Sequence, residues 1–303
     1  MGVDCAPSPE PGPQLVARFQ LGIVTHMKPH DSSTWPQLVE VAIAAAQAGA
    51  AAALPHFRRA DLQVEHKDDD SPVTIADRQA EAAIRAVIRD ACPDDGWLGE
   101  EAGTVIGRST RRWIVDPIDG TRNFVRGIPL WATLVACEDL VEGGSRPVAA
   151  AVLIPGLDEC YHAGLGGGAW YRRADAAPVA IAVSDIHDFG QALWCFETPT
   201  WFAACGRSRV FTTMTERCGL HRGLGDAYGH MLVASGRAEV VIEPHLAIWD
   251  VAATSLVVSE AGGRFSDLDG NDRLDSGHAL VTNGHLHQAT LDIVRRDSDA
   301  PTP

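Results

Sequence analysis

Residues 113 to 124 read W-I-V-D-P-I-D-G-T-R-N-F, and this stretch decides how the rest of the chain is interpreted. Trp113–Val115 is typical of the end of a buried strand. Pro117 restricts the residue before it to an extended conformation. We therefore expect Asp116 and Asp119 on a tight turn just beyond that strand. Gly120 lets a ligand approach its backbone, because it carries no side chain.

This stretch suggests metal-assisted phosphate chemistry. Paired carboxylates bind hard cations. Thr121 can begin a short helix that ends near Gly127, and the free N–H groups of a helix start suit a phosphate. The simpler interpretation is a D-P-x-D-G turn, because Asp, Pro and Gly are common turn residues.

Four further acidic residues lie outside this stretch of sequence. Thr74 is predicted to cap a helix and to place Asp77 in its first turn, where spacing alone favours a helix-dipole role. Glu100 and Glu101 follow the apolar run Trp97–Gly99, and a hairpin-like excursion follows them. Asp250 belongs to W-D-V-A-A, residues 249 to 253, at another predicted helix start.

Taken together, D-P-I-D-G-T-x-N-F, V-T-x-x-D, G-E-E and W-D-x-A-A resemble the inositol monophosphatase family of magnesium-dependent phosphatases. The resemblance covers about Trp35 to Val294. It implies an α/β fold, the layered α-β-α-β-α sandwich of the inositol monophosphatase and fructose-1,6-bisphosphatase type. The site would lie between two subdomains, and the protein would be a homodimer.

The resemblance also implies roles for individual residues. Asp116 would bridge two Mg²⁺ ions out of two or three per site, with the other ligands being Glu100, the Ile118 carbonyl, Asp119 and Asp250. Glu101 and Lys67 would lie nearby, as outer contacts or at a third metal. Catalysis would involve Glu100, with Asp77 and Thr121 orienting water for in-line attack. The amides of Gly120 and Thr121 would hold phosphate oxygens.

The substrate is expected to be a small phosphate monoester. Residues 124 to 136, F-V-R-G-I-P-L-W-A-T-L-V-A, and 225 to 230, G-D-A-Y-G-H, most resemble the histidinol-phosphate phosphatase branch. Glu243 and Asp226 would suit that cationic substrate, with Asp119 and Arg122 as further substrate contacts. Asp226 is equally well interpreted as a helix cap with His230 packed beside it. One alternative function is hydrolysis of inositol-1-phosphate. The other is a catalytically idle regulatory subunit that binds a metal or a sugar phosphate.

Composition limits the other possibilities. The chain has 303 residues and a net charge of −15, which argues against nucleic acid and anionic membranes as partners. Seven scattered cysteines favour reduced thiols and a cytoplasmic location. We expect no apolar run of membrane-spanning length and no secretory signal. The pair His285 and His287 is interpreted as a loop or helix-start feature rather than a metal site.

The predicted organisation has four parts: a flexible extension over 1–30, an α+β subdomain over 31–178, an α/β subdomain over 179–296 and a disordered tail over 297–303. Strands alternate with helices along the second half, which favours a layered arrangement. Arg209–Phe211 is predicted as a strand there, and helices are predicted near 227–234, from Trp249, and near 285–294.

Overall fold

The computed structural model describes residues 34–66, 72–141 and 144–298. Its larger sheet has eight strands and follows two long helices, α2 (Trp35–Ala53) and α3 (Ile75–Ala91). In spatial order the strands are β10 (Val179–Ile181), β9 (Ala169–Arg173), β8 (Glu159–Gly164), β7 (Gly144–Ile154), β6 (Ala132–Val141), β5 (Arg111–Asp119), β3 (Gly96–Gly99) and β4 (Gly103–Val105). All neighbours are antiparallel except β3 and β5, which run parallel.

The smaller sheet has five strands. In spatial order they are β12 (Leu220–Arg222), β11 (Leu193–Cys195), β13 (Val240–Glu243), β15 (Ala279–Thr282) and β14 (Arg264–Ser266). β11 runs parallel to both β12 and β13, and the remaining pairs are antiparallel. A separate hairpin joins β1 (Val64–His66) to β2 (Pro72–Thr74).

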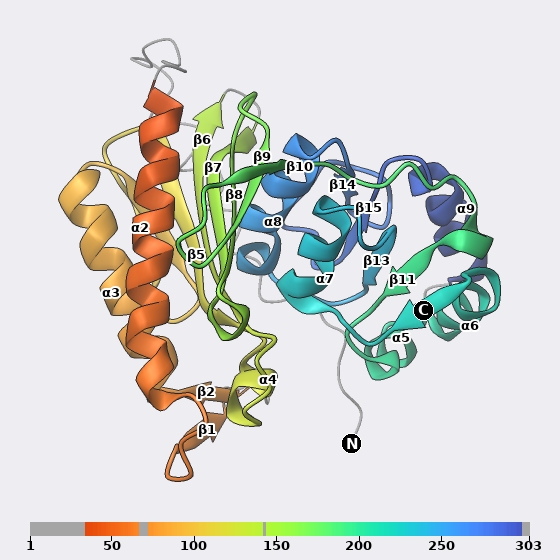
Figure 1. Ribbon diagram of the computed structural model, residues 1–303, viewed down its shortest axis with the longest axis horizontal. Coiled ribbons are helices and arrows are strands. Elements are labelled where there is room, and N and C mark those ends of the chain that lie inside the picture. The colour runs from red at the N-terminus through yellow and green to blue at the C-terminus, as the bar shows by residue number, and fades with distance from the viewer. Residues whose placement is uncertain (1–33, 67–71, 142–143, 299–303) are drawn as a thin grey trace.

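Helices form three layers around the two sheets (Figure 1). α2 and α3 cover the outer face of the large sheet. α7 (Asp226–Ala234) and α8 (Ile248–Glu260) lie between the sheets, and α5 (Pro199–Ala204), α6 (Ser208–Arg217) and α9 (His287–Asp297) cover the far face of the small sheet. A short helix, α4 (Thr121–Val125), follows β5 directly. Single 3₁₀ turns occur at Leu54–His56, Pro155–Leu157 and Phe189–Gln191. The predicted α-β-α-β-α sandwich is confirmed.

The alternation of side chains along the strands produces these layers. On β6, Val135 and Cys137 pack with the core beneath α2 and α3, while Leu134 and Ala136 pack with the core around α7 and α8. Both faces of the strand are thus buried. The large sheet is therefore apolar on both sides.

The predicted strand at Arg209–Phe211 is wrong, because these residues lie in α6. Val210 and Met214 are the buried residues of that helix, and their spacing of four is helical. The helix expected near 285–294 runs on to Asp297, which is buried, so the predicted tail is wrong at residue 297. Residues 299–303 of that tail lie outside the described residues. β10 pairs with β9 in the large sheet, although residue 179 was expected to open the second subdomain.

Two further expectations need correction. The segment Trp35–His56 is long and apolar enough for a membrane span by length and composition, contrary to the expectation that no run would be. Its helix α2 packs its buried face on the large sheet and α3, as a core helix does. Five described cysteines are free, whereas Cys205 is disulfide-bonded, so reduced thiols were wrongly expected there. The predicted extension over 1–30 lies outside the described residues.

Candidate active site

Asp116 and Asp119 lie within β5 rather than on a turn beyond it. Against β6, Asp116 pairs with Leu134 and Asp119 pairs with Ala132, so β5 contains one extra residue between the two pairs. This is a β-bulge, and Pro117 and Ile118 form it. Residues three apart on a regular strand point to opposite faces, and the extra residue brings both carboxylates to the same side. The Ile118 amide donates to Asp116 Oδ1 at 3.0 Å.

Glu100 reaches this position because β3 runs parallel to β5 and ends beside it. The Glu100 amide donates to the Val115 carbonyl at 3.3 Å. The loop that follows is held by Glu81 on α3, whose carboxylate accepts the amides of Glu101 (2.7 Å) and Ala102 (2.8 Å). A Cβ on Gly99 would lie only 2.3 Å from Glu81 Oε1, so this close approach requires glycine.

Asp250 comes from the first turn of α8, on the other side of the site. Its Oδ2 accepts the Ala247 amide at 2.7 Å, which caps the helix. One carboxylate oxygen each of Asp116, Asp119 and Asp250 lies within 4.8 Å of the others. We name these three residues and Glu100 the deep cluster.

Burial and mutual repulsion both act on the carboxylates of the deep cluster. Burial raises the pKa of Asp116 well above its usual range, and the nearby charges of Glu100, Asp119 and Asp250 raise it further. Burial likewise raises the pKa of Asp250 to about 7. No described Lys or Arg forms an ion pair with Asp116, Asp119 or Asp250. Because buried carboxylates without a partner are costly, this donor set fits a divalent, oxygen-preferring cation.

Asp77 lies close to the deep cluster, at the start of α3. As expected, Thr74 caps the helix, and both its amide and its hydroxyl donate to Asp77 Oδ2 at 2.7 Å. Burial is the main cause that raises the pKa of Asp77 to about 6, and the charges of Glu100 and Glu101 add to it. Asp77 Oδ1 is buried and accepts no hydrogen bond from the residues the structure describes.

The expected partnership of Asp77 with Thr121 is not formed by direct contact. Thr121 Oγ1 instead donates to the Ile118 carbonyl at 3.0 Å, and no hydrogen bond joins it to Asp77 among the described residues. Gly120 has φ +77°, a left-handed conformation that suits glycine, and it precedes α4. Thr121 is the first helical residue, so its amide has no acceptor within the helix.

A second group of carboxylates comes from the small sheet. Glu197, Asp226 and Glu243 each lie at or just beyond the carboxyl end of one of the parallel strands β11, β12 and β13. In α/β sheets, ligands bind at this edge. Burial raises the pKa of Asp226 well above its usual range, and the charges of Glu197 and Glu243 raise it further. We name these three residues the outer group.

Backbone contacts hold the outer group against the deep cluster. The Asp226 amide donates to Glu243 Oε1 at 2.9 Å, and the Ala227 amide donates to Asp119 Oδ2 at 2.9 Å. Asp226 is the first residue of α7 and has φ 56°, so its side chain is not the helix cap. It accepts from Asn123 Nδ2 at 3.3 Å instead. The start of α7 thus connects the two sheets at the site.

His230 is buried beside this arrangement, as the packing alternative anticipated. Its Nδ1 lies 2.9 Å from Thr254 Oγ1. Its Nε2 lies 3.1 Å from Glu243 Oε2, close enough for an ion pair but off the direction of a hydrogen bond. Arg122 is exposed, and its positive charge lowers the pKa of Asp226 and of Glu197 against the larger effect of burial. Lys67 lies outside the described residues.

Sequence reasoning missed Glu197 and the aromatic pair beside it. Burial and the charge of Glu243 raise the pKa of Glu197 to about 7. Trp201 and His245 stack with ring centroids 4.4 Å apart and planes at 27°. Glu197 follows β11, and T-P after it marks a helix start, so an acidic residue between a strand and a helix was the available signal.

Comparison with known proteins identifies the family. The model of the inositol monophosphatase family matches residues 35–298. The chain belongs to this family. Histidinol-phosphatase of Streptomyces coelicolor is 39% identical over 246 residues, 81% of this chain and 92% of the relative. Inositol-1-monophosphatase of Mesorhizobium japonicum is 36% identical over 251 residues, covering 79% and 89%.

Some similar proteins carry names that do not describe a phosphatase. Nus factor SuhB of Pasteurella multocida is 33% identical over 269 residues, covering 85% of this chain and 93% of the relative. The crystal structure of the extragenic suppressor protein suhB from Bartonella henselae superimposes with a TM-score of 0.78 at 29% identity, covering 86% and 99%. The protein described here is a phosphatase of this metal-dependent family. Its substrate has to be inferred from the site.

Proposed function

We propose that this phosphatase hydrolyses histidinol phosphate to histidinol with Mg²⁺ at the deep cluster. The observation that carries the proposal is the outer group: one buried and two half-buried carboxylates at one edge of the small sheet, joined to the deep cluster through the start of α7. Histidinol phosphate carries an amine and an imidazole, so negative charge attracts it more than it attracts a neutral polyol. The 39% identical histidinol-phosphatase supports the same choice.

In this proposal, Glu100, Asp116, Asp119, Asp250 and the Ile118 carbonyl would hold two Mg²⁺ ions, and Glu101 would be a ligand of a third. When bound, the ions polarise the phosphoryl group and lower the pKa of water. The chain itself positions the reactants. Asp77 Oδ1, which accepts no hydrogen bond from the described residues, is available to accept a proton from the attacking water.

Thr121 has a more limited role in this mechanism than the resemblance implies. Its hydroxyl donates to the Ile118 carbonyl and so orients that oxygen, while its amide and that of Gly120 receive the phosphate oxygens. In the aromatic pair, Trp201 comes from α5, which follows β11, and His245 comes from the loop that follows β13. The pair can stack on the imidazole of the substrate, with Glu197 as a negatively charged partner.

The test is phosphate release from histidinol phosphate and from inositol-1-phosphate, measured side by side with Mg²⁺. We expect kcat/KM for histidinol phosphate to be the higher by at least tenfold. A preference for inositol-1-phosphate would move the function to the second candidate, which the 36% identical relative supports. No Mg²⁺-dependent release from either substrate would favour the regulatory alternative, which the SuhB relative supports.

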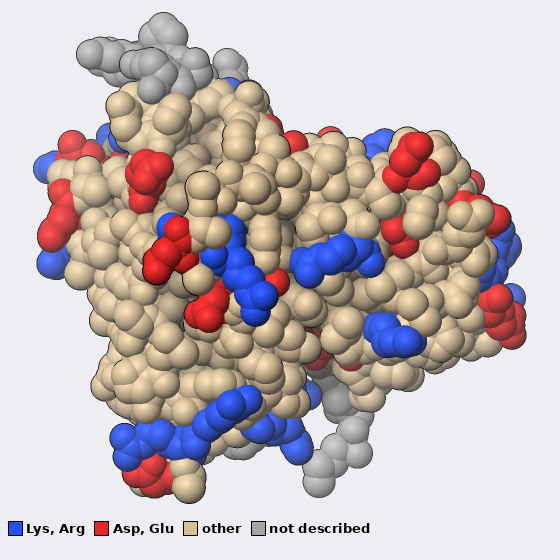
Figure 2. All heavy atoms as spheres, in the orientation of Figure 1, with Lys and Arg blue, Asp and Glu red and all other residues tan. Residues whose placement is uncertain are grey.

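Assembly and location are also proposals. Light scattering of the purified protein tests the homodimer expected from the resemblance. Figure 2 shows acidic and basic side chains scattered among uncharged ones on one face, and with the net charge of −15 this supports a small-molecule partner rather than nucleic acid. We place the protein in the cytoplasm.

A further inference from the structure

A crossing segment, residues 182–188, connects the two sheets and lies against the turn that precedes α9. Asn283 holds the segment in place: its Nδ2 donates to the Ile186 carbonyl at 2.8 Å and to Ser184 Oγ at 3.2 Å. Ser184 Oγ in turn donates to Glu239 Oε1 at 2.8 Å. Asn283 and Glu239 are both buried. The crossing segment and the turn are therefore fixed relative to each other.

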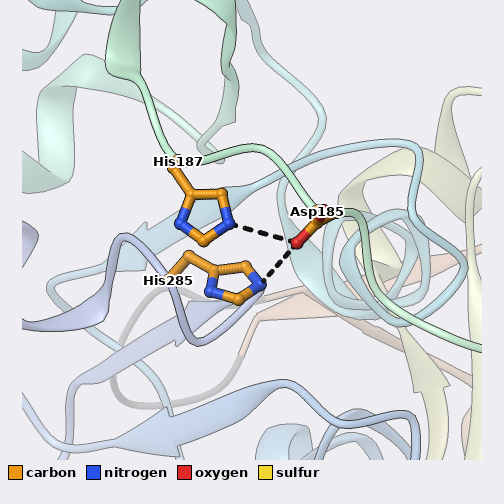
Figure 3. A group of neighbouring side chains, drawn as sticks. All are labelled: Asp185, His187 and His285. Atoms are coloured by element: carbon orange, nitrogen blue, oxygen red, sulfur yellow. Dashed lines mark hydrogen bonds and ion pairs between the residues drawn. The ribbon is translucent and has the colours of Figure 1, made fainter.

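Three potential metal ligands lie on this fixed backbone. Asp185 and His187 come from the crossing segment, and His285 comes from the turn (Figure 3). Asp185 Oδ1 lies 3.1 Å from His187 Nε2 and 3.3 Å from His285 Nε2. The two imidazole rings lie side by side, with centroids 3.8 Å apart. Both rings thus direct a nitrogen toward the same carboxylate oxygen.

These distances match those around a bound zinc ion. Donor atoms that surround a tetrahedral Zn²⁺ at about 2.0–2.1 Å lie about 3.3 Å from one another. The two nitrogen–oxygen distances, 3.1 and 3.3 Å, are close to this value, and all three donors lie within 4.8 Å of one another. We propose that Asp185, His187 and His285 bind one Zn²⁺ ion. Because all three side chains are exposed, water can complete the coordination.

This arrangement differs from the interpretation of the histidines in sequence. His285 and His287 were considered as a pair, but His287 is buried and lies within hydrogen-bond distance of Ser266 Oγ (2.9 Å) and Thr282 Oγ1 (3.0 Å). His285 has His187 as its neighbour instead, almost a hundred residues earlier in the chain. Sequence spacing gave no indication of this pairing.

The proposed zinc site is separate from the deep cluster. Asn283 and Glu239 lie at the amino end of β13, where the Asn283 amide donates to the Glu239 carbonyl at 3.0 Å. Glu243, a member of the outer group, lies at the carboxyl end of β13. Four residues of strand separate the two ends by roughly 13 Å. The ligand types differ too, because imidazole nitrogen favours Zn²⁺ whereas an all-oxygen set favours Mg²⁺.

The experiment counts the Zn²⁺ ions that the full-length protein binds. Metal-free protein is titrated with Zn²⁺ by calorimetry in excess Mg²⁺, which occupies the deep cluster, and His187→Ala and His285→Ala are titrated in the same way. His221→Ala removes another exposed histidine of the same small sheet and is the matched control. We expect one more equivalent of Zn²⁺ in the wild type and the control than in the two variants, or binding at least tenfold weaker in these variants.

Two further measurements test the zinc site independently of the calorimetric titration. Co²⁺ in place of Zn²⁺ should give d–d absorption of a nitrogen-containing site in the wild type, and the absorption should be lost in His187→Ala. Zn²⁺ should raise the Tm of the wild type but not of His285→Ala, because the ion would join the crossing segment to the turn. Mg²⁺-dependent phosphatase activity should be equal in all these proteins. Equal Zn²⁺ stoichiometry and affinity in wild type and both variants would overturn the proposal.

Discussion

The deep cluster and the outer group each combine buried and half-buried carboxylates, yet the charged and polar groups around the two sets differ. Backbone amides are the hydrogen-bond donors that reach the three aspartates of the deep cluster, and no described Lys or Arg pairs with them. In the outer group, Glu243 has His230 beside it, and the charge of Arg122 acts on Asp226 and Glu197. In our proposal the first set binds divalent cations from solution, whereas the second binds a singly charged organic cation.

The largest effect should come from neutralising the deep cluster. Asp116→Asn should lower kcat about 1000-fold, since roughly 4 kcal/mol of charge stabilisation would be lost. The folded state should persist, because asparagine can still accept the Ile118 amide and the like-charge repulsion falls. Circular dichroism checks the fold, and phosphate release checks the rate. Full activity of Asp116→Asn would show that catalysis does not depend on the charge of the deep cluster.

Asp77 serves both the helix and the site, and two substitutions separate these roles. Asp77→Asn can still accept from Thr74, so the fold should remain, but the rate should fall about 100-fold as a proton acceptor is lost. Thr74→Ala should instead cost about 1 kcal/mol of folding free energy and leave kcat nearly unchanged. Thermal melts and steady-state kinetics measure the two effects. The same loss of kcat in both variants would show that Asp77 acts only through the helix.

The outer group should control affinity rather than rate. Glu243→Gln should raise KM for histidinol phosphate by about 10- to 100-fold, because a charged contact contributes about 1.5–3 kcal/mol. The rate with inositol-1-phosphate should change little. Glu216→Gln, on an exposed part of α6, is the matched control. Equal losses with both substrates would mean that Glu243 does not distinguish them.

The smallest effect concerns the pH dependence of stability without metal. Folding raises the pKa of Asp77 to about 6 and of Asp250 to about 7, above the value near 3.9 of an unfolded chain. Their contribution to stability is complete below about pH 4 and is lost as the pH rises through 6 to 7. In EDTA, Tm should therefore fall by roughly 5 °C between pH 5 and pH 8. Saturating Mg²⁺ should remove most of this decline in Tm. Scanning calorimetry measures Tm at each pH, and an equal decline with and without Mg²⁺ would contradict the prediction.

The sequence predicted the layers and part of the site because these depend on local patterns. The capping of α3 by Thr74 and the alternation along β6 follow from short-range rules. The bulge at Pro117 was not predictable, because it depends on the pairing of β5 with β6. Glu197 was missed for a similar reason: only the parallel pairing of β11, β12 and β13 brings it to Glu243. A short segment with only two apolar residues, such as Arg209–Phe211, fits strand and helix equally well.

The contact between Gly99 and Glu81 has a consequence for how this protein can evolve. Any side chain at Gly99 would collide with the carboxylate that holds the loop after Glu100. A shorter residue in place of Glu81 would release the amides of Glu101 and Ala102, and a Cβ on Gly99 would still lie 2.7 Å from Trp97 Nε1. A single substitution at either residue should therefore lower stability. The pair thus restricts which single substitutions the protein can accept. In a library of random variants, these two positions should tolerate fewer substitutions than the exposed positions of α3 around them.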